Sequence, residues 1–199
     1  PRSTPLSLHD ALPIYILRIL GYMGSQDGYF PRLQVMEYLE VYAHAQGLYG
    51  LAARERCMEV LQMGHLERRA EQLVEEQSAS VRRELSFLRA ILHRPRLLLL
   101  DDPFNGMESA QKLAMEELFA ILAEDEVTVL MASQSLPDAA HLCGEIGIIE
   151  KGRIISEGNL SDILRQARSE ALLYLRVCEA PEAAVAILRK EALVRTISR

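Results

Sequence analysis

The sequence has no tryptophan, three cysteines and no long apolar run. Since a membrane-spanning helix needs roughly 20 apolar residues, no segment of this chain is expected to cross a bilayer. Cys57, Cys143 and Cys178 are scattered, odd in number and without metal-ligand spacing, which excludes a disulfide framework or a zinc site built on them. They are expected to be buried or incidental thiols in a reducing compartment.

A basic surface is missing as well. The formal net charge is −6, and the 22 lysines and arginines are interspersed with 28 acidic residues. A nucleic-acid-binding domain presents a continuous basic face, so this function is excluded. The five histidines form no pair at ligand spacing on one predicted helix. No metal site is therefore expected other than magnesium held together with a nucleotide.

What the chain does contain is a strong strand signal that ends in two acids. Four leucines at 97–100 precede Asp101 and Asp102. Such a run indicates a strand buried on both faces, which is typical of a parallel sheet covered by helices. Ligands of these sheets bind at the carboxyl ends of the strands, where adjacent acids suit Mg²⁺, so Asp101 is the predicted metal ligand. The alternative is that Asp102-Pro103 only punctuates a turn.

A capped helix leads into this strand. Ser78 or Ser80 can serve as its N-cap, and apolar residues then recur at helical spacing, at Val81, Leu85, Leu88 and Leu92. Pro95 closes the turn into the strand. The order of helix, His-Arg-Pro-Arg turn, leucine strand, double acid and Asn-Gly loop resembles the ATP-binding subunit of ABC transporters, more narrowly the bacterial export type.

Three further segments keep the family's order, and the resemblance extends over about residues 17–164. Residues 20–33 resemble its glutamine loop after a strand, residues 127–134 the strand that ends at its switch histidine, and residues 148–158 its closing hairpin. The resemblance implies an α/β fold of the P-loop NTPase type. Its parallel sheet would carry helices on both faces and a helical insert, with a partial small β-α-β domain at the C-terminal end.

Periodicity and turn residues add a coarse map of the elements, which alternate in a doubly wound pattern. Strands are predicted at 16–21, 97–100, 127–131, 145–149, 171–177 and 193–197. Helices are predicted at 34–45, 53–63, 78–92, 109–124, 136–142, 160–168 and 181–190, with a short helix or lid at 66–76.

Two catalytic positions of the family are altered in this sequence. Asp102 stands where the resemblance places a water-polarising glutamate, and its carboxylate sits one methylene, roughly 1.5 Å, closer to the backbone. Gln134 stands at the switch histidine, and an amide can hydrogen-bond a phosphate but carries no positive charge. The two residues are the catalytic candidates, with slow or absent hydrolysis expected.

The cofactor-binding positions are altered too. Ser78 keeps the serine of the family's Leu-Ser-Gly-Gly signature, while Ala79 and Ser80 replace both glycines. Ser25 aligns with the glutamine of the glutamine loop, and Gln26 follows it by one position. The resemblance implies that the loop at residues 105–108 contacts a second subunit. This loop ends in Glu108 where the family usually has Asp. The candidates for cofactor binding are Ser78, Ser25, Gln26, Asn105, Gly106 and Glu108.

The chain shows no glycine-rich loop ending in Lys and Ser/Thr, which would lie before Tyr15 in the family. Residues 1–14 hold three prolines and no helix or strand period. Within them, residues 6–14 resemble the translation of a sequencing-adapter string, so an artefactual leader is expected; a genuine proline-rich arm is the alternative. The expected domains are 15–165, an ABC-type nucleotide-binding domain, and 170–199, the start of a small C-terminal domain.

The resemblance implies an ATP-binding subunit that couples ATP and Mg²⁺ binding, with weak or absent hydrolysis, to transport by a membrane partner. It would act as a homo- or heterodimer of nucleotide-binding domains beneath a transmembrane permease, in the cytoplasm at the inner face of the membrane. Two alternatives stay open: a non-hydrolytic interaction or regulatory subunit, and a non-functional gene fragment. A glycine-rich loop with lysine upstream of Tyr15 would favour ATP binding over the interaction role.

Overall fold

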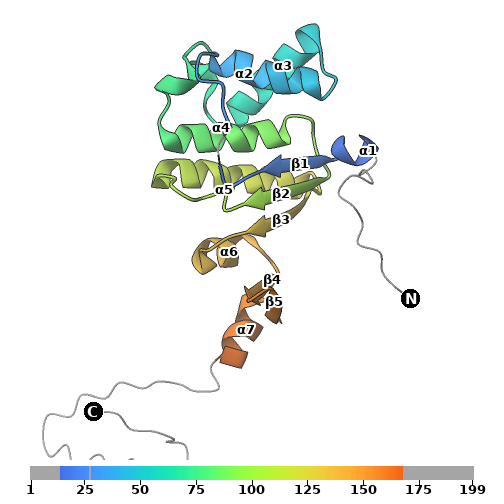
Figure 1. Cartoon of the computed structure of the whole chain (residues 1–199), viewed down its shortest axis with the longest axis vertical. Helices are drawn as coiled ribbons and strands as arrows, with labels where there is room; N and C mark the ends of the chain where they lie inside the picture. Colours follow the sequence, from blue (N-terminus) through green and yellow to red (C-terminus); the bar gives the residue numbers. More distant parts are fainter. Residues whose placement is uncertain (1–13, 27, 168–199) are drawn as a thin grey trace, which may run out of the picture. The chain divides into compact units, whose positions relative to one another are not determined.

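Three parallel strands in the order β1, β2, β3 form the sheet of the first part of the chain (Figure 1). The computed structural model describes residues 14–26 and 28–167. The strands of this sheet are β1 (Leu20–Met23), β2 (Leu97–Asp101) and β3 (Thr128–Ala132). The helices before Ile146 are α1 (Ile14–Leu17), α2 (Val35–Ala45), α3 (Gly50–Met63), η1 (Glu67–Arg69), η2 (Val74–Glu76), α4 (Ala79–Ile91), α5 (Ser109–Glu124) and α6 (Leu136–Leu142).

The chain divides into two units at Ile146/Gly147, and each is described by itself. The second unit holds most of β4 (Ile146–Glu150), together with β5 (Arg153–Gly158) and α7 (Leu160–Ala167). β4 and β5 form a two-stranded sheet of their own. Lys151 and Gly152 connect them with φ of 49° and 75°, the left-handed pair typical of a tight hairpin turn. The hairpin expected at Lys151-Gly152 is therefore present.

One face of the larger sheet packs on α4 and the core. Leu98 and Leu100 of β2 point to this face and are 0% and 3% exposed. The helix comes very close to β1, because a Cβ placed on Gly21 would lie 2.3 Å from the backbone oxygen of Ala90. Only glycine allows this approach without a shift of the helix. α5 lies against α4, and the ring of Phe119 on α5 contacts Phe87 of α4 and Phe104 of the loop after β2.

The other face of the sheet is less covered within the described residues. Leu97 and Leu99 are only half-buried, and Tyr22 and Leu130 beside Leu99 are 59% and 65% exposed. The run of four leucines predicted burial on both faces, whereas the structure buries alternate leucines fully. The physical reason is the position of the packed helix α4, which covers the Leu98 face.

Most predicted elements are present with small shifts of their ends. α5 and α6 have the predicted bounds, and α4 begins after its N-cap Ser78, whose Oγ accepts a hydrogen bond from Val81 N at 3.2 Å. The first strand begins at Leu20 rather than at 16, because Ile14–Leu17 form a helical turn. The short helix or lid at 66–76 is two 3₁₀ helices. The elements predicted at 171–177, 181–190 and 193–197 lie outside the described residues.

An unpaired carboxylate is buried in α4. Glu84 is 1% exposed, and its Oε1 has no hydrogen-bond partner among the described residues. Gly64 at the end of α3 leaves room for it, since a Cβ there would lie 3.2 Å from Glu84 Oε1. Burial raises the pKa of Glu84 to about 7, although the Arg69 charge acts in the opposite direction. Near neutral pH this side chain therefore exchanges a proton inside the core.

Replacing Glu84 with glutamine should make stability less dependent on pH. Because the folded-state pKa is raised, the wild type has its full stability below about pH 4.5 and loses about 3 kcal/mol of unfolding free energy as the pH rises to 7. Glu84→Gln carries no titrating proton. Its free energy of unfolding should therefore exceed that of the wild type by more at pH 8 than at pH 5. Urea unfolding at the two pH values measures this difference.

The matched control is Glu55→Gln, which changes an exposed glutamate of α3. Its stability should follow the pH dependence of the wild type. A Glu84→Gln difference that stays constant between pH 5 and pH 8 would show that Glu84 does not titrate in the core.

Candidate functional site

The two acids stand at the carboxyl end of β2. Asp101 is the last residue of the strand, and Asp102 continues the pairing because its backbone N–H donates to Ala132 O of β3 at 2.7 Å. Both side chains are half-buried. Asp102 has φ of 51°, a left-handed conformation that aspartate adopts more readily than most residues with a side chain. The left-handed backbone of this turn therefore favours aspartate at position 102.

The structure brings the two catalytic candidates together. The backbone N–H of Gln134 donates a long hydrogen bond to Asp102 Oδ1 at 3.5 Å, while the Gln134 side chain is exposed. This contact joins the loop after β2 to the loop after β3. The two strands are neighbours in the sheet, so their carboxyl ends meet at one edge, as expected for a parallel arrangement.

Arg83 of α4 holds the ends of β1 and β2 to each other. Its Nη1 donates to Gly24 O at 2.7 Å, and its Nη2 donates to Asp101 O and Asp102 O, each at 2.8 Å. Its Nε donates to Pro103 O at 3.3 Å. The side chain is only 3% exposed. A guanidinium offers five donors in a rigid fork, so one side chain can satisfy acceptors from two loops.

Serines at the start of α4 connect this helix to the loop after β2. Ser78 caps the helix and is exposed. Ser80 is 2% exposed, and its Oγ accepts a hydrogen bond from Glu108 N at 2.9 Å and donates to Gln111 Oε1 at 3.3 Å. Ala79 and Ser80, which replace the two signature glycines, have ordinary helical backbone in α4. Ser80 thus makes a contact that glycine could not make.

The other candidates lie on the exposed rim around these contacts. Asn105 N donates to Asp102 O at 3.1 Å, and Gly106 takes a φ of 72° in the same loop. Ser25 and Gln26 directly follow Gly24, whose carbonyl Arg83 holds. The exposed side chains among the candidates are those of Ser25, Gln26, Ser78, Asn105, Glu108 and Gln134.

Sequence reasoning did not single out Arg83 or the contact made by Ser80. A signal for Arg83 was present, because it lies one helical turn before Phe87, on the stripe of α4 that faces the core. A cation on such a stripe must find acceptors inside the fold. The acceptors are backbone carbonyls of loops distant in sequence, and no side-chain pattern marks them.

The chemistry of the donor set fits magnesium only together with a nucleotide. Among the described residues no group of three or more His, Cys, Asp or Glu side chains could enclose a metal ion. Mg²⁺ is commonly held by one or two carboxylates with substrate phosphates, a role open to Asp101. The full sequence, however, contains no Gly-Lys pair from which a phosphate-cradling loop could be built.

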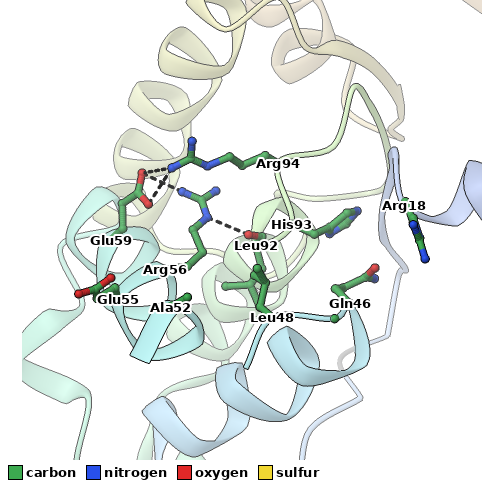
Figure 2. Close-up of a pocket in the computed structure, with 11 residues that line it drawn as sticks. Arg18, Gln46, Leu48, Ala52, Glu55, Arg56, Glu59, Leu92, His93 and Arg94 are labelled. Atoms are coloured by element: carbon green, nitrogen blue, oxygen red, sulfur yellow. Dashed lines mark hydrogen bonds and ion pairs between the residues drawn. The ribbon is translucent and has the colours of Figure 1, made fainter. Parts of the chain in front are cut away.

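A cavity of about 640 Å³ with a mixed polar and apolar lining lies at the opposite ends of the strands (Figure 2). Arg18 precedes β1, and His93 and Arg94 precede β2, so the cavity is separate from the acids. Glu59 on its wall pairs with Arg56 at 2.9 Å and with Arg94 at 3.1 Å. Arg56 Nε also donates to Leu92 O at 2.8 Å, which caps the end of α4. These contacts fix α3 to the end of α4.

No helix among residues 14–26 and 28–167 is long and apolar enough to span a membrane.

A comparison with protein-family profiles finds no match. Curated proteins do match. The chain is 34% identical over 140 residues to the Nod factor export ATP-binding protein I of Burkholderia pseudomallei, covering 70% of this chain and 46% of that protein. It is 27% identical over 179 residues to the linearmycin resistance ATP-binding protein LnrL of Bacillus subtilis, covering 90% of this chain and 58% of that protein.

Solved structures agree with these relatives. An ATP-binding subunit of an ABC transporter matches with a TM-score of 0.64 at 26% identity, covering 78% of this chain and 65% of that structure. The chain belongs to the ABC transporter ATP-binding family. CbiO1 of Clostridium perfringens shares the fold, with a TM-score of 0.64 at 17% identity, covering 77% of this chain and 62% of that structure. The chain spans about half the length of the curated ABC relatives it matches.

Membership of the ABC family confirms the resemblance and the P-loop NTPase type of α/β fold expected from the sequence. The relatives are ATP-binding proteins by name. The roles of Asp101, Asp102, Gln134 and the exposed candidate residues remain predictions.

Proposed function

We propose that this chain is part of an export-type ABC ATP-binding subunit, which couples ATP binding and weak or absent hydrolysis to transport by a membrane partner. The observation that carries the proposal is the meeting of Asp102 with the loop of Gln134, beside two loops that Arg83 holds together. The similarity to a Nod factor export ATP-binding protein supports the export type.

Each group at the strand ends has a proposed task. Asp101 would hold Mg²⁺, which supplies charge neutralisation on phosphate oxygens when it is bound. Asp102 would accept a proton from an attacking water, and Gln134 would hydrogen-bond the terminal phosphate. Ser25 or Gln26 would add an oxygen ligand toward the metal. Ser78 and the loop at Asn105, Gly106 and Glu108 would contact the nucleotide or the second subunit of a dimer.

The same geometry supports slow hydrolysis. Asp102 reaches less far than the glutamate expected from the family, and a displacement of about 1 Å can lower a catalytic rate on the order of 10²-fold. Gln134 is neutral, so one source of positive charge near the transferred phosphate is lost. Both changes weaken the chemical step while leaving contacts for binding in place.

Lengthening the acid at position 102 should raise the rate of hydrolysis. The test uses a chimera in which the glycine-rich loop segment of an ABC ATP-binding relative is fused upstream of Tyr15. In this chimera Asp102→Glu should release phosphate from ATP about tenfold faster or more, because the carboxylate gains one methylene of reach. Phosphate release by the purified proteins measures the effect.

Two comparisons make this result interpretable. The 199-residue chain without the added loop should not bind a fluorescent ATP analogue with micromolar affinity in the presence of magnesium. In the chimera Asp101→Asn should weaken the magnesium dependence of binding. An unchanged or slower rate in Asp102→Glu would assign Asp102 to the left-handed turn alone, with the chain acting as a non-hydrolytic interaction subunit.

The loop after β1 is the proposed contact with the transmembrane partner at the inner face of the membrane. Tyr29 and Phe30 are 39% and 49% exposed, which leaves an apolar surface available. The inner sides of both rings are already packed. Arg82 lies 4.9 Å from the centre of the Tyr29 ring, and the Phe30 and Tyr42 ring centres are 6.4 Å apart. These contacts present the two side chains from a defined loop.

Substituting Tyr29 and Phe30 together with serine should abolish recruitment to membranes that contain the transporter's membrane subunit. The melting temperature should fall by only a few degrees, because half of each ring is outside the core. Co-sedimentation with such membranes and thermal unfolding measure the two effects. The matched control replaces Tyr49 and Leu51 with serine. These side chains are 68% and 72% exposed, and their replacement should leave recruitment unchanged. Normal recruitment of the Tyr29 and Phe30 variant would exclude this docking surface.

A further inference from the structure

Two arginines on one face of α4 contact aromatic rings next to the loop that follows β1. Arg82 and Arg89 are separated by about two helical turns, so their side chains leave the helix in nearly the same direction. Arg82 lies 4.9 Å from the centre of the Tyr29 ring, and Arg89 lies 4.8 Å from the centre of the Tyr42 ring. A cation over an aromatic face is attracted by the ring, most strongly where water is excluded. Since Tyr29 belongs to the loop and Tyr42 to α2, α4 is attached to both.

Arg89 joins the loop to α2 through a single nitrogen. Its Nη1 donates to Gly28 O at 3.2 Å, to Tyr38 Oη at 3.2 Å and to Tyr42 Oη at 3.4 Å. The Tyr38 hydroxyl also donates to Gly28 O over 3.5 Å. Tyr38 is 1% exposed, so the packing of α2 fixes its ring. The two tyrosines therefore fix the guanidinium, and the guanidinium holds the backbone at Gly28.

α4 holds the chain on both sides of the candidate metal ligands that follow β1. Arg83 donates to Gly24 O at 2.7 Å, whereas Arg89 donates to Gly28 O. The candidate ligands at positions 25 and 26 lie between these two glycines. The two anchors act on one short segment, so the loss of either should loosen it.

We propose that Arg89 is a positioning residue, which sets the place of residues 24–30 relative to α4. It would hold Tyr29 and Phe30 where the membrane partner docks, and Gln26 beside the carboxyl ends of the strands. The use of the loop rests on the proposed function, but the contacts that hold it do not. Arginine suits this task because its central carbon lies over a ring while its terminal nitrogens extend further to oxygen acceptors.

A single tryptophan tests whether Arg89 holds the loop. The full sequence contains no tryptophan, so Tyr29→Trp in the 199-residue chain supplies one reporter, whose ring can keep the contact with Arg82. Adding Arg89→Gln should raise the acrylamide quenching constant of this tryptophan about twofold, because a ring that is 39% exposed becomes largely exposed. The matched control is Arg68→Gln, which changes an exposed arginine of η1 and should leave the constant unchanged.

Arg89→Lys separates the ring contact from the hydrogen bond to Gly28. The ammonium stands near the place of the guanidinium carbon, so it stays over the Tyr42 ring but ends about 1.3 Å short of Nη1. The quenching constant should rise in Arg89→Lys, by less than in Arg89→Gln, while far-UV circular dichroism stays unchanged. If Arg89→Gln unfolds, the lysine variant alone decides. A constant equal to that of the reporter chain in either folded variant would overturn the proposal.

Recruitment to membranes separates the role of Arg89 from the docking function itself. Arg89→Gln should weaken co-sedimentation with membranes that contain the transporter's membrane subunit severalfold, whereas Arg68→Gln should not. Normal recruitment after Tyr29 and Phe30 are replaced with serine would exclude docking at this loop, and the quenching result would still decide whether Arg89 holds it. If the serine variant is not recruited while Arg89→Gln is recruited normally, positioning by Arg89 is overturned.

Discussion

The arrangement of the strand ends depends on one buried cation. Arg83 reaches from α4 to backbone carbonyls of Gly24, Asp101, Asp102 and Pro103. These carbonyls belong to two segments that are far apart in the sequence, because Gly24 follows β1 while Asp101 ends β2 and Asp102 and Pro103 begin the loop after it. Without the guanidinium, buried acceptors would be left unpaired, which costs about 1 to 3 kcal/mol for each group. Helix, strand ends and candidate site residues therefore form one unit.

A second constraint is the backbone at Asp102. Its left-handed φ of 51° and its contact with the loop of Gln134 both favour a short side chain with an oxygen near the backbone. A catalytic group that must reach a water molecule would benefit from a longer side chain. The two demands conflict, and the residue present satisfies the turn. Under the proposed function, this conflict keeps the architecture of the site while it slows the chemical step.

Local signals in the sequence predicted the helices well and the sheet less well. Ser78 as N-cap and the apolar spacing behind it were sufficient for α4, and turn residues bounded α5 and α6. The start of β1 was misplaced because Ile16 and Leu17 have strand-like side chains but form a helical turn. The leucine run did not reveal that its two faces differ in cover. Arg83 lies on the core-facing stripe of α4, but no residue pattern marks the backbone carbonyls that it holds.

Hydrogen exchange in Arg83→Lys tests the central role of this side chain most directly. Lysine keeps the charge but replaces the guanidinium fork by one ammonium group. If Arg83 holds the two loops, exchange should be faster in both together, at residues 28–33 and at the amides of Asp102, Asn105 and Glu108, with α2 and α3 unchanged. Arg54→Lys on the surface of α3, where Arg54 lies 3.8 Å from Glu40, should match the wild type. Faster exchange in only one loop, or in neither, would show that Arg83 does not hold the two loops together.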